Sequence, residues 1–164
     1  MAHAMFRSDN MEATTDGKFL VSLYVSTAGG IDNGRVVKVG NLKTGEREVR
    51  EYTTPAANTA LSDIAILGSE EVIKDKKYHA VGDFYNEYGT VARGYKVVSD
   101  DLLAVTAEAL DGSGSYTVGT TICELQADTK LKAVDTLTQG STKVGTLEAI
   151  EVDGATTWYV FKIV

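Results

Sequence analysis

The stretch "STAGGIDNGRVVKVGNLKTGERE", residues 26–48, decides between a phosphate-binding loop and the turns of a β-protein. A phosphate loop needs glycines that lead from a strand into a helix, whose N-terminus meets the anion. Here the glycines lead into "RVVKVG", a β-branched run that begins a helix poorly, and the chain contains no Gly-Lys-Ser or Gly-Lys-Thr. Asn33-Gly34 instead tolerates the positive φ of a tight turn. The stretch therefore predicts strands joined by hairpin turns.

The same alternation of turns and short β-rich runs continues along the chain. Runs rich in Val, Ile, Thr and Tyr, which suit a pleated surface, lie between the turns. We predict hairpins about Lys43–Gly45 and Asp153–Gly154, and a turn at Asn86–Gly89 between two further β-rich runs. Many short strands with frequent turns predict an all-β fold, a compact β-sandwich or barrel-like body with at most one or two short helices.

Three segments need separate interpretation. Residues 58–77 have room for a short helix, which Gly68 would break. Residues 99–110 begin with helix-start residues but also alternate, so a strand is favoured there and a short helix stays open. The last run, "TTWYVFKIV", is apolar on both faces, which predicts a central strand with Trp158 and Phe161 as core anchors.

The chain of 164 residues has the length of one ordinary domain. Residues 1–17 are polar and mixed and precede the first clear strand. A segment that cannot bury enough apolar surface by itself stays mobile until a partner supplies that surface. We therefore predict a flexible N-terminal arm over residues 1–17 that contributes to binding and not to folding, and a single β-rich domain over residues 18–164.

Charge and residue counts oppose several functions. The net charge is −7, from 23 acidic and 16 basic residues, which opposes direct binding to nucleic acid or to an anionic membrane surface. No apolar run is long enough to span a membrane. The single Cys123 is expected to be a buried thiol, and only His3 and His79 could serve it as a base. We predict no catalytic residue, no metal site and no cofactor.

Two groups of acidic residues could in principle form a site, but their spacing favours simple turns. A calcium loop that begins at Asp32 would need a closing Glu at its twelfth position, where Lys43 stands. Asp83 and Glu87 could pair as acid and base, but a predicted turn separates them. Four tyrosines lie within residues 78–95. The nearby Arg93 and Lys96 are offset by Asp83 and Glu87, so the tyrosines favour a core or a protein interface over a base-stacking platform.

The order of segments resembles that of a known family. The Asn-Met-Glu-Ala run of residues 10–13 is followed by a strand and then by the Asp-Asn-Gly-X-Val-Val turn of residues 32–37. Later segments are "VGDFYNEYGTVARGYKV", "LLAVTAEALDG", "YTVGTTI" and the closing "VGTLEAIEVDG" with "WYVFKIV". Together these segments, over most of residues 6–164, resemble the decoration or cement proteins of tailed-bacteriophage heads.

This resemblance implies a non-enzymatic virion protein that is made in the host cytoplasm, binds the outer capsid surface and stabilises it. Its partner would be the major capsid protein, and it would self-associate as a trimer or another local-symmetry cluster. The capsid-contact residues expected on this basis are Met5, Phe6, Asn10, Met11, Tyr85 and Tyr88. Two alternatives stay open, a tail-tube or head–tail joining component and a β-barrel that binds a small ligand.

Overall fold

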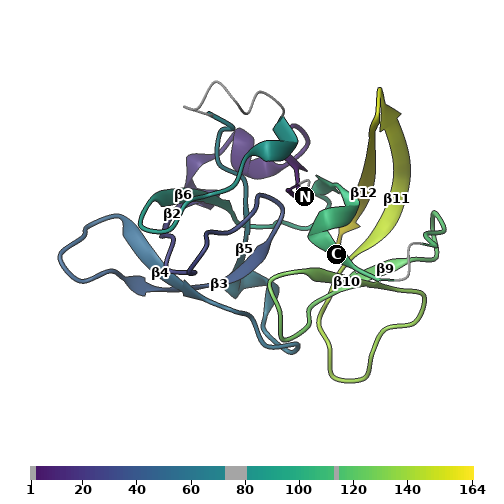
Figure 1. Cartoon of the computed structure of the whole chain (residues 1–164). Helices are drawn as coiled ribbons and strands as arrows, with labels where there is room; N and C mark the ends of the chain where they lie inside the picture. The colour runs from purple at the N-terminus through teal and green to yellow at the C-terminus, as the bar shows by residue number, and fades with distance from the viewer. Residues whose placement is uncertain (1–2, 73–80, 113–114) are drawn as a thin grey trace.

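The computed structural model describes residues 3–72, 81–112 and 115–164, which form two β-lobes around a shared core (Figure 1). One lobe is a closed five-stranded barrel, and the other is a seven-stranded sheet. Helical structure in the described part of the chain is limited to single 3-10 turns. The all-β prediction is therefore confirmed.

The barrel is built from a contiguous part of the chain, residues 20–95. Its strands are β2 (Leu20–Tyr24), β3 (Val36–Leu42), β4 (Val49–Thr53), β5 (Ile64–Leu67) and β6 (Val91–Tyr95). The order around the barrel is β2-β4-β3-β5-β6, in which β2 and β4 are parallel and the other pairs are antiparallel. The predicted hairpin about Lys43–Gly45 joins β3 to β4 and is confirmed.

The sheet combines the N-terminal segment with the C-terminal part of the chain. Its strands, in spatial order, are β1 (Phe6–Arg7), β7 (Leu102–Val105), β12 (Thr156–Ile163), β11 (Lys143–Asp153), β9 (Ile122–Glu124), β10 (Leu131–Val134) and β8 (Leu110–Asp111). The 3-10 turns are η1 (Glu12–Thr14), η2 (Gly17–Phe19), η3 (Leu61–Asp63), η4 (Val81–Asp83) and η5 (Ala107–Ala109). Residues 99–110 thus contain strand β7 and a single helical turn, and the strand favoured there is confirmed.

Strand β5 joins the two lobes because both of its faces are buried. Ile64 and Ile66 belong to the large core between the barrel and the sheet, whereas Ala65 and Leu67 pack in the interior of the barrel. A short, continuously apolar strand is the pattern expected for a strand that lies between two apolar layers. The barrel wall therefore forms one side of the core that the sheet completes.

Strand β12 lies between β7 and β11, so the predicted central position is confirmed. Phe161 is completely buried in the large core. Trp158 is buried on the opposite face of the sheet, in a smaller cluster with Ala104 and Val160. The two aromatic residues therefore stabilise different faces, because residues three apart on a strand point in opposite directions.

The turn predicted at Asn86–Gly89 is present, since Gly89 has a φ of 82° and the Thr90 N–H donates to the Glu87 carbonyl oxygen at 3.2 Å, but the described residues before it form no strand. Residues 81–83 form the turn η4, and Asn86 makes an isolated bridge with Ile31. Strand β6 pairs with β2 and β5 across the barrel instead. Residues 73–80, which include Tyr78, His79 and the end of the segment expected to hold a short helix, lie outside the described residues. The hairpin about Asp153–Gly154 is confirmed as β11–β12, which extends away from the barrel in Figure 1.

The N-terminal segment is part of the folded body, which corrects the flexible arm predicted over residues 1–17. Phe6 and Met11 are buried in the large core. Phe6 pairs with Val105 of β7, and its ring lies so close to Gly68 that a Cβ there would overlap it. The prediction failed because these partners lie far away in the sequence, where no local pattern reveals them.

We expect Met11→Ala to lower the free energy of unfolding by about 2–5 kcal/mol, because it leaves a cavity in the large core. Asn10→Ala, at an exposed neighbouring position, is the matched control and is expected to change little. Urea unfolding followed by tryptophan fluorescence measures both. Equal stability of Met11→Ala and the parent protein would support a flexible arm instead of a folded N-terminal segment.

Candidate functional site

The residues predicted to contact a partner are not all on the surface. Phe6 and Met11 are buried, and Met5 packs in part against the small cluster around Trp158, so these three side chains serve the fold. Asn10 is exposed. Tyr85 is 36% exposed, and Tyr88, in the same loop, is 62% exposed. Tyr85 and Tyr88 therefore remain available to a partner, whereas a buried Phe6 or Met11 is not.

The structure brings the N-terminal segment to Tyr85 through His3, a residue that the sequence placed in a mobile arm. The His3 and Tyr85 rings stack with centroids 4.9 Å apart. The backbone N–H of His3 donates to the carbonyl oxygen of Gly82 at 2.7 Å. The loop that carries both tyrosines is therefore tied to the start of the described chain. Sequence spacing offered no signal for this contact, because 82 positions separate the two rings.

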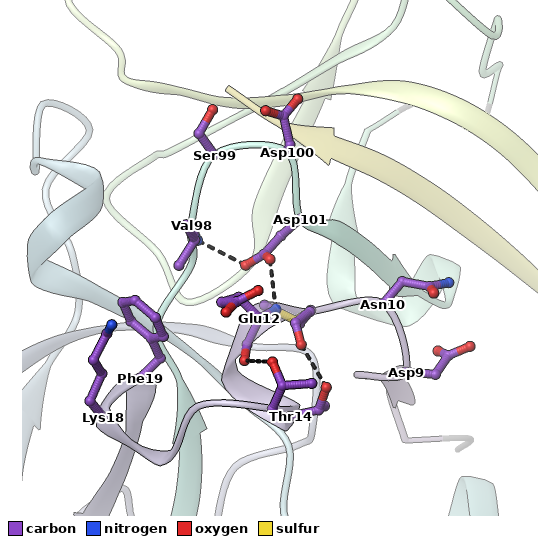
Figure 2. Close-up of a pocket in the computed structure, with 12 residues that line it drawn as sticks. Asp9, Asn10, Glu12, Thr14, Lys18, Phe19, Val98, Ser99, Asp100 and Asp101 are labelled. Atoms are coloured by element: carbon purple, nitrogen blue, oxygen red, sulfur yellow. Dashed lines mark hydrogen bonds between the residues drawn. The ribbon is translucent and has the colours of Figure 1, made fainter.

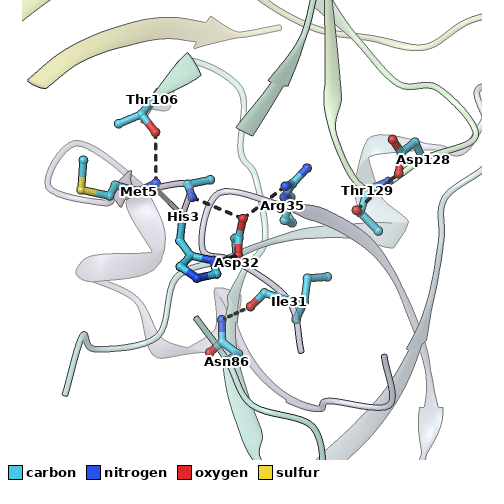
Figure 3. A network of polar contacts seen from close by, with 10 residues as sticks. His3, Met5, Ile31, Asp32, Arg35, Asn86, Thr106, Asp128 and Thr129 are labelled. Carbon is cyan, nitrogen blue, oxygen red and sulfur yellow. Dashed lines mark hydrogen bonds and ion pairs between the residues drawn. The ribbon is translucent and has the colours of Figure 1, made fainter. Parts of the chain in front are cut away.

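Asp32 is the centre of a polar network that fastens the N-terminal segment to the barrel (Figure 3). Its Oδ1 lies 2.7 Å from His3 Nδ1, and its Oδ2 accepts from Arg35 Nη2 at 3.2 Å and from the Ala4 N–H at 3.3 Å. Burial disfavours the ionised carboxylate, but these hydrogen bonds and the Arg35 charge outweigh it and lower the pKa of Asp32. Asp32 is therefore a charged anchor within the fold.

Two buried asparagines complete the network beside Asp32. Asn86 Nδ2 donates to the Ile31 carbonyl at 3.0 Å and to Asn33 Oδ1 at 3.1 Å. Asn33 Nδ2 donates to the Ser69 carbonyl at 2.9 Å, and Asn33 Oδ1 also accepts from the Ser69 N–H at 3.0 Å. Gly34 follows with φ of 77°, as the predicted tight turn requires. These side chains use their hydrogen bonds to hold loops together, so residues 31–34 have a structural role.

The His3–Asp32 pair has the geometry of an oriented base but lacks a nucleophile. In the described part of the chain, no serine, threonine or cysteine side chain hydrogen-bonds to His3. Cys123 is completely buried in the sheet, and this burial raises the pKa of its thiol to about 12. The thiol is therefore protonated at neutral pH, and a protonated, buried thiol is a poor nucleophile.

An open groove lies between the N-terminal segment and the loop before β7 (Figure 2). Its volume is about 530 Å³, and its lining includes Asp9, Glu12, Lys18, Asp100 and Asp101. The Asp101 carboxylate accepts from the N–H groups of Glu12 and Val98, both at 2.8 Å. Asp100 pairs with Lys162 at 3.0 Å. Asp100 and Asp101 thus bond to other segments of the fold, and the groove is too open to exclude water from a reaction.

Glu124 is a buried carboxylate in the sheet, and both of its oxygens accept hydrogen bonds. Its oxygens accept from the Thr138 N–H at 2.7 Å and from Thr138 Oγ1 at 2.6 Å. Lys132 Nζ lies 3.6 Å from the same carboxylate. Glu124 thereby holds the loop before β11 against the sheet. Among the described residues, no three His, Cys, Asp or Glu side chains converge as metal ligands.

The chain matches no protein-family model, no curated protein and no solved structure. None of the helical turns in residues 3–72, 81–112 and 115–164 has the length or apolar character of a membrane-crossing helix. Tyr85 and Tyr88 are exposed, whereas the polar side chains at Asp32, Asn33, Asn86 and Glu124 bond within the fold.

Replacement of Asp32 by Asn is expected to lower the free energy of unfolding by about 1–3 kcal/mol at pH 7, because it removes the charge that His3, Ala4 and Arg35 surround. The folded pKa of Asp32 is depressed. The carboxylate therefore stabilises the fold fully above its unfolded pKa and loses this effect as the pH falls through the folded value. Urea unfolding between pH 7 and pH 3 should show the difference between Asp32→Asn and the parent shrinking at acidic pH.

The matched control for Asp32→Asn is Asp63→Asn, since Asp63 is an exposed carboxylate that bonds to the neighbouring Ser62. This control should differ little from the parent at either pH. A constant difference between Asp32→Asn and the parent over the whole range would contradict the assignment of Asp32 as an ionised anchor.

Proposed function

We propose that this chain is a structural protein of a tailed-bacteriophage virion, which binds the outer surface of the capsid and stabilises it. The support from the sequence is the resemblance of its ordered segments to head decoration proteins. The support from the structure is a rigid β body whose polar groups serve its own fold. In this proposal the major capsid protein is the partner, and copies of the chain gather as trimers or other local-symmetry clusters.

The observation that carries a non-enzymatic role is the satisfaction of buried polar groups. In the described part of the chain, every buried side-chain nitrogen and oxygen has a hydrogen-bond partner within the chain. Catalytic sites generally present polar groups aimed at a substrate, often with perturbed pKa values in a cleft. Asp32, Asn33, Asn86 and Glu124 instead bond to neighbouring segments. A cement protein needs this rigidity and no reactive centre.

The interior of the barrel disfavours the small-ligand alternative. Side chains from all five strands and the loop at Ile31 pack there, namely Leu23, Val25, Ile31, Val37, Tyr52, Ala65, Leu67 and Ala92. A five-stranded barrel filled by these side chains has no space for a ligand, in contrast to wider barrels that enclose one. The tail-tube or head–tail joining alternative predicts rings that assemble without a capsid.

The charge of the chain is compatible with the outside of a shell. The net charge of −7 is unsuited to contact with packaged DNA, which lies inside the capsid. Asn10, Tyr85 and Tyr88 are the predicted contact residues that are exposed. Tyrosine is enriched where proteins meet, because its ring supplies apolar area and its hydroxyl a hydrogen bond.

The proposal is tested by co-sedimentation with shells of the virus that encodes this chain, purified without the chain. We expect binding that saturates at a fixed number of copies per shell, since symmetry offers a fixed number of sites. Tyr88→Ala is expected to weaken binding, and Thr15→Ala, at an exposed position outside that loop, is not. No binding by the intact protein, or ring assembly in the absence of shells, would contradict the proposal.

A further inference from the structure

The second half of strand β11 forms an open edge of the sheet. Strand β9 pairs with β11 only as far as Thr146, and the next bonds on that side join Leu147 to Gly119 and Thr121. On its other side, β11 pairs with β12 as far as Asp153. Figure 1 shows this part of β11 on the outer side of the projecting hairpin. Beyond Leu147, the outer side of β11 therefore has no neighbouring strand in the described part of the chain.

Two residues of this open side direct their backbone groups outward. Asp153 and Thr156 close a two-residue turn, so they form a hydrogen-bonded pair. Hydrogen-bonded and non-hydrogen-bonded pairs alternate along an antiparallel ladder, so Glu151 is bonded to β12, whereas Ile150 and Val152 point their N–H and C=O groups away from it. We call residues 150–152 the β11 edge. An unpaired edge of this kind is a template for a further strand.

The two faces of the β11 edge differ in chemistry. Ile150 and Val152 lie on the same face as Tyr159, which packs against the large core, and they are 40% and 73% exposed. Glu151 and Asp153 lie on the opposite face of the sheet. The side chains of an added strand would lie beside these two rows, because cross-strand neighbours share a face. A strand that fits the edge therefore alternates apolar side chains with side chains that suit carboxylates.

The polar face of the edge keeps an excess of negative charge. Glu151 and Asp153 are the only charged residues within residues 149–161. Arg7 Nη1 lies 3.0 Å from Glu151 Oε2, but the same guanidinium also pairs with Asp9. Asp153 makes no ion pair with the described residues. Three carboxylates thus accompany one guanidinium on this face, and a basic partner complements them.

A second copy of this chain does not fit the β11 edge. Two copies that paired edge to edge, with their apolar residues on one face, would place their carboxylates together on the other face. Glu151 would then lie opposite its own counterpart or the counterpart of Asp153, and like charges directly opposite each other destabilise a sheet. The charges therefore oppose self-association through this edge and favour a partner of opposite charge.

We propose that the β11 edge binds an extended peptide segment in which apolar and basic side chains alternate, and that this segment joins the sheet as an added strand. Its backbone bonds to the outward groups of Ile150 and Val152, and its alternating side chains supply the specificity. The apolar side chains pack beside Ile150 and Val152, and the Lys or Arg side chains meet Glu151 and Asp153. This binding activity goes beyond the proposed attachment to a capsid and does not depend on it.

Three fluorescein-labelled peptides of equal length test the proposal by fluorescence anisotropy with the full chain. The first repeats Lys-Val three times between Gly-Ser ends, and the second has Glu in place of each Lys. The third has the composition of the first but groups its valines together, so that the alternation is lost. We expect the second and third peptides to bind about tenfold or more weakly than the first, because each lacks one of the two matching features. Added salt should weaken binding of the first peptide.

Val152→Pro tests the backbone contact. It removes the outward N–H at this position and leaves the hydrogen-bonded pairs of β11 with β12 in place, and proline is tolerated at edge positions whose N–H faces solvent. We expect it to bind the Lys-Val peptide about tenfold or more weakly than the parent protein does. Val152→Thr, which keeps the N–H and a β-branched side chain, is the matched control and should bind like the parent. Glu151→Gln with Asp153→Asn should remove the preference for the Lys-Val peptide over the Glu-Val peptide.

Amide hydrogen exchange locates the peptide without any variant. In the free protein the Ile150 and Val152 amides face solvent and should exchange fast. With saturating Lys-Val peptide their exchange should slow by at least about tenfold, because the added strand accepts their hydrogen bonds. The Glu151 and Asp153 amides, which are already bonded to β12, should change less.

Selective binding of the Lys-Val peptide together with slowed exchange at Ile150 and Val152 would support the proposal. Absence of binding, or equal binding of all three peptides, would overturn it and leave the carboxylates with the single role of keeping edges apart. Binding that leaves the exchange of these two amides unchanged would also overturn it, because the peptide would then lie elsewhere on the molecule. The exchange measurement uses the parent protein, so it decides the outcome even where Val152→Pro fails to fold.

Discussion

The rest of the structure depends on one apolar contact, between the outer wall of the barrel and the inner face of the sheet. Ile64 and Ile66 supply the barrel side from β5, and Leu147 and Phe161 supply the sheet side from β11 and β12. Each of these side chains is fully buried, and burying such a side chain contributes about 1.5–3 kcal/mol. Neither a short five-stranded barrel nor a sheet with an open apolar face would be expected to persist without the other.

The N-terminal segment and the projecting hairpin acquire their roles from this contact. Phe6 and Met11 extend the shared core, while Arg7 covers Trp158 on the outer face of the sheet. The polar anchors at Asp32 and Glu124 then fix the loops at the border of the core. Because the barrel ends where Leu147 pairs with Phe161, the hairpin beyond that pair keeps an apolar face without a cover.

The features predictable from the sequence were those with a local signal. Alternation of apolar and polar residues predicted strands β2 and β7. Turn residues predicted the hairpins at Lys43–Gly45 and Asp153–Gly154, and apolar residues on both faces predicted the central position of β12. The docking of Phe6 against Val105 and the pairing of His3 with Asp32 depend on contacts between distant segments, which no spacing rule encodes. The barrel closure through parallel β2 and β4 has the same long-range origin. Exposure of Tyr88 and Val152 likewise follows from where the shared core ends.

Native-state hydrogen exchange tests most directly whether one shared core holds both lobes. We expect the amides of β5 in the barrel and of β12 in the sheet to exchange with the same opening free energy, equal to that of global unfolding. The amides of residues 149–153, beyond the core, should exchange faster. A barrel that opens at a distinctly lower free energy while the sheet stays protected would show two separate cores and contradict this account.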